Sequence, residues 1–469
     1  MLYKKRLSGL IKMFVSVLLF APIYCFANNI DLLKNIKKRA PALDSPTIHI
    51  DAVKDQTAPS PPSPTRPSVP LDKEKKSPPA ERREKNDAFH LNARLQIDLR
   101  VHDIKANPIS NDVATSNNLF DIRRARLGVV FDVAPLKCNL SFDFANSVKL
   151  KNAFVDFPLF SNSKLRAGQF TYPFSNETTS SSRYHEFLEV ASIGHALSAS
   201  RDRGLALNST WFDQRFYLIA GVFNGTKDSR LAQNSAFDFT MRVIWHAMKQ
   251  WHDTVELWLG GAYATGRRRS SKVEDITFEP ESKSGQIYFF AEFPEDRAYT
   301  RTRSSIDATL LLGPVMTKVE YLQASYDFDK AVLVQGGYAI ASYMLTGEQR
   351  AIKKASLYRQ QVARPVTGGQ GWGAWEIAVR YSWFSVDDLF FEDDGLFTDW
   401  QAVAKDRYTD GGSAWTLAVN WYPEQRIRVM ANWIRSSAKT SFFDNREDIV
   451  ATPAVTIEEA FLLRFQIEL

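Results

Sequence analysis

The sequence HLNARLQIDLRVH, residues 90–102, has an apolar side chain at every odd position and a polar one at every even position. Successive side chains of a β-strand point to opposite faces, so this alternation predicts a strand with one apolar and one polar face. The same alternation returns at residues 375–383, 415–421 and 461–469. The chain from Ala88 onward is therefore predicted to be all-β.

Three features favour a membrane barrel over a soluble sandwich. The apolar positions are rich in Trp, Phe and Tyr, many of them near strand ends; the strands run about ten residues; and the chain ends on the last residue of a strand. Beyond the N-terminus no stretch approaches the roughly 20 apolar residues of a helical span. Lipid offers no hydrogen-bond partner to an open sheet edge, so the sheet must close. The 382 residues from Ala88 onward, at roughly 24 per strand and connection, predict a transmembrane antiparallel β-barrel of about 16 strands.

The N-terminal part of the chain has a different composition. Residues 1–27 begin with a cationic segment, continue with an apolar core and end on small residues, as a secretory signal peptide cut near Ala27 does. Residues 28–86 are rich in proline and charge, so we expect a disordered linker, serving either as a tether to the cell wall or a partner, or as a spacer. Residues 87–469 are then the barrel, integral to a Gram-negative outer membrane.

Charge and cysteine content limit the possible functions. The leader has four cations and no acid, and residues 28–86 have 12 cations and 8 acids. These two parts each carry +4, and because the whole chain carries +6, residues 87–469 carry a net charge of −2. An anion preference must therefore come from where the charges lie. Cys138 is the only cysteine after the leader, which excludes an intramolecular disulfide and a cysteine metal site. Its alternation with Leu140 predicts an apolar environment.

Several arginines are predicted to face a water-filled lumen. If the odd positions of the first strand face lipid, Arg94 points inward, and the same logic in residues 120–131 points Arg124 and Arg126 inward, with Arg123 near the lower rim. Guanidinium groups at alternating positions form a column of donors suited to phosphate or carboxylate oxygens.

Two further basic groups are candidates for lining the pore: Arg267 and Arg269 in an Arg triplet, and Arg301 with Arg303 at the start of a strand. The alternative is that lumen arginines pair with acids or extend to the rims, and that the triplet lies in an external loop. Acids available for such pairs are Asp98, Asp132, Asp143, Asp307 and Glu376.

Short segments spread over most of residues 88–469 resemble the phosphate-selective porins O and P of Gram-negative outer membranes, and they occur in the order of that family. The segments are RRARLG (123–128), LRAGQF (165–170) with PFS (173–175), TSSSR (179–183), LTGE (345–348), GWGAWEIAVRYS (371–382) and NWY (420–422). One departure is the last residue, Leu469, where the family's final strand commonly ends in Phe.

The resemblance implies a 16-stranded barrel, usually a homotrimer, whose third external loop folds inward and narrows the pore. That loop would fall between Asn176 and Asp202, with Arg183 and Arg201 on it and Arg203 at its exit. It also makes Arg166, in the second segment, a candidate for guiding anions. The expected partners are outer-membrane lipid and small anions such as phosphate.

Other function classes have less support. No histidine pairs with a nucleophilic serine in a recognisable motif, and neither an HExxH zinc signature nor a phosphate loop is present, so we do not expect an enzyme or a cofactor. No nucleic-acid-binding module appears. A general or weakly selective pore remains open, as does a plugged structural or adhesive barrel. The prediction is a passive diffusion channel for small solutes, with anions preferred.

Overall fold

The computed structural model describes residues 88–105, 119–133, 135–225, 237–251, 254–269, 275–293, 298–328, 330–353, 356–367, 369, 371–391, 409–439 and 455–469. The leader expected at residues 1–27 and the linker expected at 28–86 lie outside this part of the chain.

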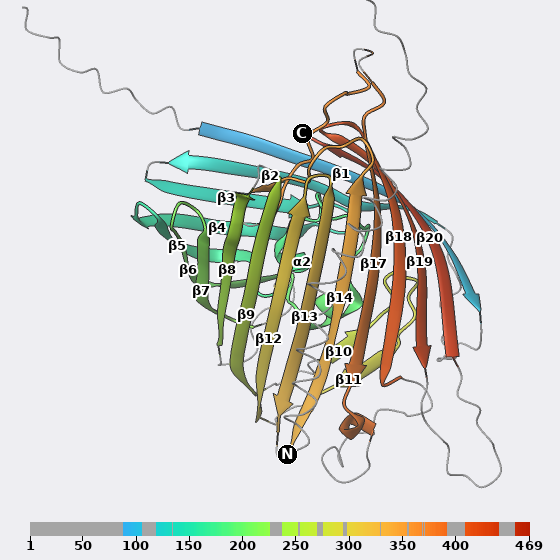
Figure 1. Cartoon of the computed structure of the whole chain (residues 1–469). Helices are drawn as coiled ribbons and strands as arrows, with labels where there is room; N and C mark the ends of the chain where they lie inside the picture. The colour runs from blue at the N-terminus through green and yellow to red at the C-terminus, as the bar shows by residue number, and fades with distance from the viewer. Residues whose placement is uncertain are drawn as a thin grey trace, which may run out of the picture. The chain divides into compact units, whose positions relative to one another are not determined.

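Sixteen strands of the described chain close into an antiparallel barrel, as the alternating sequence predicts (Figure 1). Each strand pairs with its neighbour along the chain, and β1 closes the ring against β20, with Leu99 opposite Leu463. The barrel strands are β1 (Ala88–Lys105), β2 (Leu119–Val133), β3 (Leu136–Asp143), β4 (Lys149–Phe160), β5 (Ser163–Thr171), β6 (Arg201–Trp211), β7 (Phe216–Phe223), β8 (Asp238–Trp251), β9 (Val255–Arg269), β12 (Ala298–Leu312), β13 (Val315–Asp327), β14 (Ala331–Met344), β17 (Ala374–Val386), β18 (Gly411–Glu424), β19 (Ile427–Lys439) and β20 (Val455–Glu468).

Alternation sorts the side chains of β1 as predicted. Leu91 on the outer face is 57% exposed, whereas Gln96 and Asp98 on the inner face are fully buried. Cys138 on β3 pairs in register with Phe131, an exposed outer-face residue, and has no disulfide partner. Apolar residues thus face the bilayer and polar ones the lumen, which is the arrangement that a lipid environment requires.

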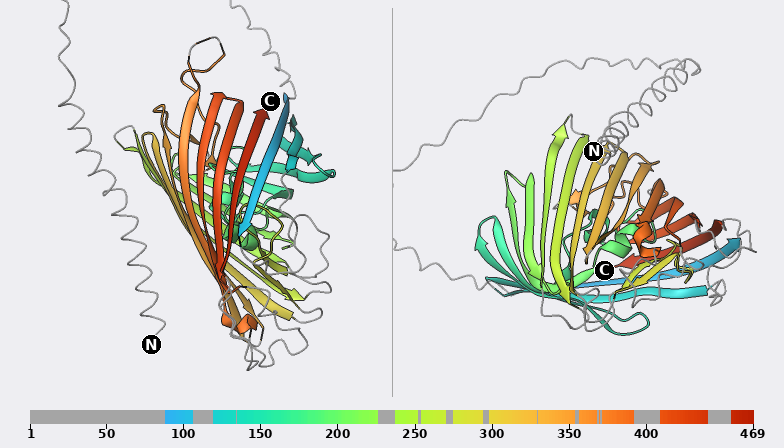
Figure 2. Two further views of the ribbon diagram at one scale, coloured as in Figure 1. Left: turned by 90° about the vertical axis from the view of Figure 1, so that its right-hand side faces the viewer. Right: turned by 90° about the horizontal axis from the view of Figure 1, so that it is seen from below.

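The two ends of the barrel differ. Short connections such as 161–162, 313–314 and 425–426 define a turn end, and longer loops lie at the opposite, loop end. One loop, residues 172–200 between β5 and β6, carries the short helices α2 (Asn176–Thr179) and α3 (Ser192–Leu197) and enters the lumen (Figure 2). We call it the inner loop. It confirms that an inward-folding loop occupies this part of the sequence.

Two more segments enter the lumen, and the sequence did not predict them. From the loop end comes the hairpin of β10 (Asp275–Phe278) and β11 (Phe289–Glu292). From the turn end comes the long connection 345–373 between β14 and β17, which contains β15 (Ile352–Lys353) and β16 (Ser356–Leu357). Arg350 of this turn-end segment donates to the Tyr184 carbonyl of the inner loop at 2.5 Å, so the two elements meet inside the barrel.

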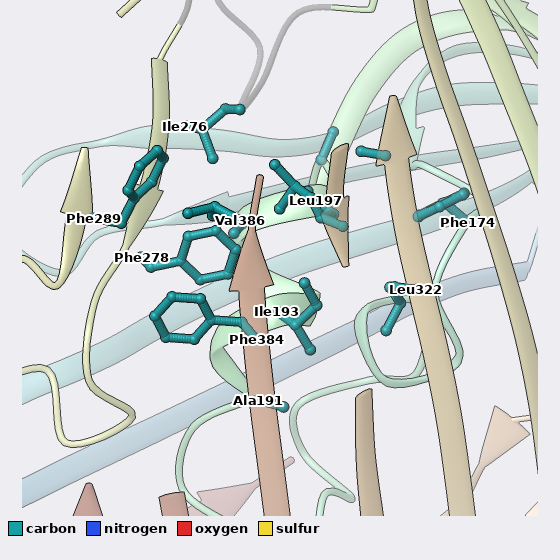
Figure 3. Packing of buried hydrophobic residues seen from close by; sticks show 14 of the residues in the cluster. Phe174, Ala191, Ile193, Leu197, Ile276, Phe278, Phe289, Leu322, Phe384 and Val386 are labelled. Atoms are coloured by element: carbon teal, nitrogen blue, oxygen red, sulfur yellow. The ribbon is translucent and has the colours of Figure 1, made fainter. Parts of the chain in front are cut away.

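Apolar side chains fill part of the lumen near the loop end (Figure 3). Ile193 and Leu197 of α3 belong to the same buried cluster as Phe278 of β10 and Phe384 of β17, and the rings of Phe278 and Phe384 stack with centroids 4.0 Å apart. The 3₁₀-helix η2 (Asp388–Phe391) contributes Phe390. This part of the lumen is therefore packed like a protein core, whereas the sequence suggested mostly polar inward positions.

No helix in the described part of the chain is long and apolar enough to cross a membrane.

Candidate functional site

A polar cavity of about 610 Å³ lies between the inner loop and the wall formed by β2–β6. The inner loop contributes a row of hydroxyl groups from residues 178–182, and the strands contribute most of the charge. Among the described residues that line the cavity, seven are cationic and two are carboxylates, so the space carries an excess of positive charge. The charged lining residues are Arg123, Arg124, Arg126, Lys149, Lys151, Arg201, Lys353, Asp143 and Glu189.

Arg124 and Arg126 lie side by side on the inner face of β2, as alternation predicts. The Arg124 guanidinium donates to the Gln96 side chain at 2.9 Å and has no carboxylate within ion-pair distance among the described residues. Arg126 differs because it forms an ion pair with Asp143 at 2.7 Å. Within the described residues, no carboxylate thus lies within ion-pair distance of Arg124, whereas the charge of Arg126 is partly compensated.

Two β-bulges add cations that alternation alone misses. Arg123 is the extra residue of a bulge in β2 opposite Gln96 and Ile97, and Lys151 is the extra residue of a bulge in β4 opposite Ser141 and Phe142. A bulge redirects a side chain that the regular pleat would place elsewhere. The prediction of Arg123 near the lower rim was wrong, because the bulge turns it into the lumen, where it donates to Glu189 of the inner loop at 2.8 Å.

The other arginines that the sequence predicted to line the pore near this wall have different surroundings. Arg201 lines the cavity and donates to Asn152 at 2.9 Å. Arg94 is buried and donates to Ser182 at 3.1 Å, and Arg183 donates to Asn92 at 3.3 Å, so both join the inner loop to β1. Arg166 forms an ion pair with Asp156 at 2.6 Å, and Arg203 donates to Gln169 at 3.3 Å. Of these five residues only Arg201 lines the cavity; Arg94, Arg183, Arg166 and Arg203 do not.

Arg301 and Arg303 point inward on β12, as predicted, but both are buried against a carboxylate. Each guanidinium lies within 2.9 Å of Asp238, which also binds Arg268 at 2.7 Å. Arg303 donates in addition to the carbonyl of Leu197 in α3. These arginines therefore fix a loop to the wall and are not among the residues that line the cavity.

The Arg267–Arg269 triplet continues strand β9 and does not lie in a loop. Arg267 alternates with Tyr263, which is 43% exposed, and so lies on the outer face, contrary to the prediction that it lines the pore. Arg268, the neighbour that was not a candidate, faces inward. The backbone of Arg269 ends the strand, and its side chain lies outside the described part of the structure.

Buried ion pairs hold the inner loop in the lumen. Arg380 of β17 binds Glu177 of α2 at 3.0 Å and Glu281 of the β10–β11 loop at 2.6 Å. Arg464 of β20 binds Asp98 at 2.6 Å and approaches Glu189. A fully buried charge is stable only when it is paired, so these contacts fix the position of the loop.

Glu186, near the tip of the inner loop, has two cationic partners. Lys318 of β13 lies at 3.3 Å and Arg350 of the turn-end segment at 3.2 Å. Burial alone would raise the pKa of Glu186, but the two cations outweigh it and lower this pKa to about 2. The carboxylate is therefore ionised at neutral pH and connects three separate parts of the chain.

The acids proposed as alternative partners do have basic neighbours. Asp143 binds Arg126 at 2.7 Å, Asp307 binds Arg242 at 2.7 Å, and Asp132 binds Lys137 at 3.2 Å. Asp98 and Glu376 bind Arg464 and Arg350 in the same way. Within the described residues, no cluster of histidine, cysteine and acidic side chains could hold a metal ion.

Comparison with known proteins was made by family model, by sequence and by structure. A family model described as "Phosphate-selective porin O and P" matches residues 89–460. A search of curated proteins by sequence found no match.

Solved structures share the fold at low sequence identity. The outer membrane channel DcaP of Acinetobacter baumannii is 11% identical, with 82% of this chain and 97% of that chain covered and a TM-score of 0.50. OprB of Pseudomonas putida is 10% identical, with 81% and 94% covered and a TM-score of 0.50. An anion-selective porin from Comamonas acidovorans is 12% identical, with 82% and 100% covered and a TM-score of 0.48.

Proposed function

The chain belongs to the phosphate-selective porin O and P family, and from that premise we propose that it conducts small anions, phosphate or similar ions among them, through the cavity beside β2–β6. Family and fold make it a passive channel of the outer membrane and point to a channel rather than an enzyme. The particular residues that select the solute are the new part of the proposal.

The observation that carries the proposal is the unequal pairing of cations around the cavity. Arg124 has only a neutral partner, and Lys149 has no carboxylate within ion-pair distance among the described residues. Uncompensated cations in a narrow space with low-dielectric walls raise the local concentration of anions. The hydroxyl groups of residues 178–182 on the opposite side can replace part of an ion's hydration shell, and conduction requires that each such contact be weak enough for the ion to leave.

The test is the reversal potential of the full-length mature protein in a planar bilayer under a KCl gradient, repeated with phosphate added to one side. We expect an anion-selective current that phosphate reduces. A double variant that carries both Arg124→Ala and Arg126→Ala should have a lower anion-to-cation permeability ratio than the unmodified protein. The matched control is Arg267→Ala, which removes a cation from the outer face. An unchanged ratio in the double variant would place Arg124 and Arg126 outside the permeation path.

A plugged structural barrel is the second candidate, and one observation favours it: the apolar cluster that fills the lumen at α3, β10 and β17. Folded protein that inserts into the bilayer without any conductance would support this candidate. Large steps insensitive to phosphate would instead indicate a general pore on the same barrel.

We propose that the protein is a homotrimer whose contact surface includes β3, β5 and β7. These strands have 8, 9 and 8 residues, at or below the roughly 9–11 that a tilted strand needs to cross a bilayer. A neighbouring copy would cover this short wall. Leu140→Lys on the outer face of β3 should reduce the trimer mass measured by light scattering, whereas Leu417→Lys on the outer face of β18 should not. Equal masses would argue against this interface.

For the N-terminal part we propose that residues 1–27 are a signal peptide and that residues 28–86 are a Pro-rich, charged linker. The mass of the mature protein should correspond to cleavage near Ala27. A protein lacking residues 28–86 should still fold and conduct if this segment is only a spacer.

A further inference from the structure

The outer face of the barrel carries an apolar groove of about 600 Å³ over β7, β8 and β9 near the turn end. Its walls are aromatic and aliphatic side chains, and Arg215, in the turn between β6 and β7, is the one charged residue among those lining it. The apolar lining residues include Phe216, Val243, Trp245 and Leu259. The groove lies on the outer face of β7–β9, whereas the lumen cavity lies inside the barrel against β2–β6, and the two share no lining residue.

A glycine makes the groove deep. Gly261 occupies an outward position of β9, where its neighbours in the alternation, Leu259 and Tyr263, both carry large side chains. A Cβ atom added at Gly261 would meet only the Ser305 carbonyl oxygen, at 3.6 Å, within 4 Å. Space is therefore left open at this point of the outer face, and bulky residues border it.

The turn at the end of the groove is held in an unusual backbone conformation. Phe212, Asp213 and Gln214 all have positive φ values, of 54°, 59° and 63°, a region that L-residues rarely adopt in succession. Phe212, the first residue of this turn, is 76% exposed and lines the groove. Arg215, the last residue of the turn, lines it as well. Lys249 of β8 donates to the Asp213 carbonyl at 3.2 Å, so a second cation lies at the same turn.

We propose that this groove binds one glycerophospholipid of the periplasmic leaflet. The short-turn end of an outer-membrane barrel faces the periplasm, so Arg215 and Lys249 lie where lipid phosphates are found. An acyl chain fits the apolar channel over Gly261 beside Trp245 and Leu259, and the guanidinium of Arg215 offers paired donors to the phosphate oxygens. Trp side chains such as Trp245 are common at the membrane–water interface, because the indole ring has an apolar body and a polar N–H group. The proposal does not depend on which ion the lumen conducts.

The experiment is native mass spectrometry of the full mature chain in detergent, titrated with 1-palmitoyl-2-oleoyl-phosphatidylethanolamine or with the matching diacylglycerol, which lacks the phosphate. Gly261→Leu fills the groove and should abolish the tightest phospholipid adduct. Arg215→Gln should weaken phospholipid binding at least fivefold and leave diacylglycerol binding unchanged. Two matched controls should bind as the unmodified protein does: Ala431→Leu on the outer face of β19 and Arg426→Gln in another exposed turn.

Three outcomes would overturn the proposal. If Gly261→Leu binds phospholipid like Ala431→Leu, the groove is not the site. If Arg215→Gln weakens both lipids equally, or neither, the phosphate is not recognised by Arg215. If Gly261→Leu changes the oligomer mass while the lipid adduct stays, a second copy of the chain occupies the groove. A conductance unchanged in both variants distinguishes these results from any failure of the anion-channel proposal.

Discussion

Arg124 on β2 and Arg380 on β17 both point into the lumen, yet their surroundings are opposite. Arg124 borders the cavity and donates to the neutral Gln96, whereas Arg380 is buried between Glu177 and Glu281. The β2–β6 side thus has cations that line the cavity, although Arg123 there also binds Glu189 of the inner loop. On the β8–β20 side, Arg380 and Arg464 are buried in ion pairs with the inward-folding segments. The same residue type at the same kind of position thus lines a cavity on one side and holds inward-folding segments on the other; only the first kind belongs to the proposed anion path.

The largest effect is expected from a substitution of Arg380, on the β8–β20 side, where the arginines form buried ion pairs. Arg380→Met leaves Glu177 and Glu281 without their cation, and removing one partner of a buried ion pair typically costs about 3–5 kcal/mol. The free energy of unfolding, measured by urea titration with tryptophan fluorescence, should fall by about that amount.

Arg124→Met is the matched control, because no carboxylate among the described residues depends on Arg124. Its unfolding free energy should change by less than about 1 kcal/mol. Equal losses in the two variants would show that the two sides do not differ in the way their ion pairs indicate.

A smaller effect is expected when Arg124, on the β2–β6 side, is given a carboxylate partner like those of Arg380. Gln96→Glu places a carboxylate next to Arg124, whose guanidinium lies 2.9 Å from the Gln96 oxygen, and so compensates a cation that otherwise has only a neutral partner. The anion-to-cation permeability ratio should fall about two- to threefold, since screening by water weakens each charge in the cavity. Reversal potentials under a KCl gradient measure this ratio, and an increase would contradict the assignment of Arg124.

The sequence predicts the barrel well because lipid imposes alternation on every strand, and β1, β9 and β12 follow it. The sequence predicts the ion pairs less well, because the partner of an inward arginine depends on which loop enters the lumen. Arg301 and Arg303 were predicted to line the pore, but Asp238 and the inner loop bury them. Arg123 and Lys151 were missed as lining residues because each sits in a bulge, which breaks the period of two on which the prediction rests.

The pH dependence of the inner loop gives a still smaller effect. Lys318 and Arg350 lower the pKa of Glu186 to about 2, below its ordinary value of 4.5, so the stability that these pairs contribute is complete above about pH 5 and is lost as the pH falls toward 2. Single-channel conductance in symmetric KCl should therefore stay constant from pH 7 to pH 5. Lys318→Met removes one cation and should move the onset of any change to higher pH, and a change already at pH 6 in the unmodified protein would contradict the role of Glu186.

The smallest effect is expected at Arg267, and comparison with Arg268 makes it informative. The two residues are adjacent in β9, but Arg267 lies on the outer face, whereas Arg268 is buried at 2.7 Å from Asp238. Arg267→Gln should leave the permeability ratio unchanged and alter the unfolding free energy by no more than about 0.5 kcal/mol. Arg268→Gln should destabilise the protein more, although Arg301 and Arg303 still bind Asp238. A shift of one residue in the register of β9 exchanges the two faces, so a lower ratio in Arg267→Gln together with an unaffected Arg268→Gln would show that this strand is paired one residue out of place.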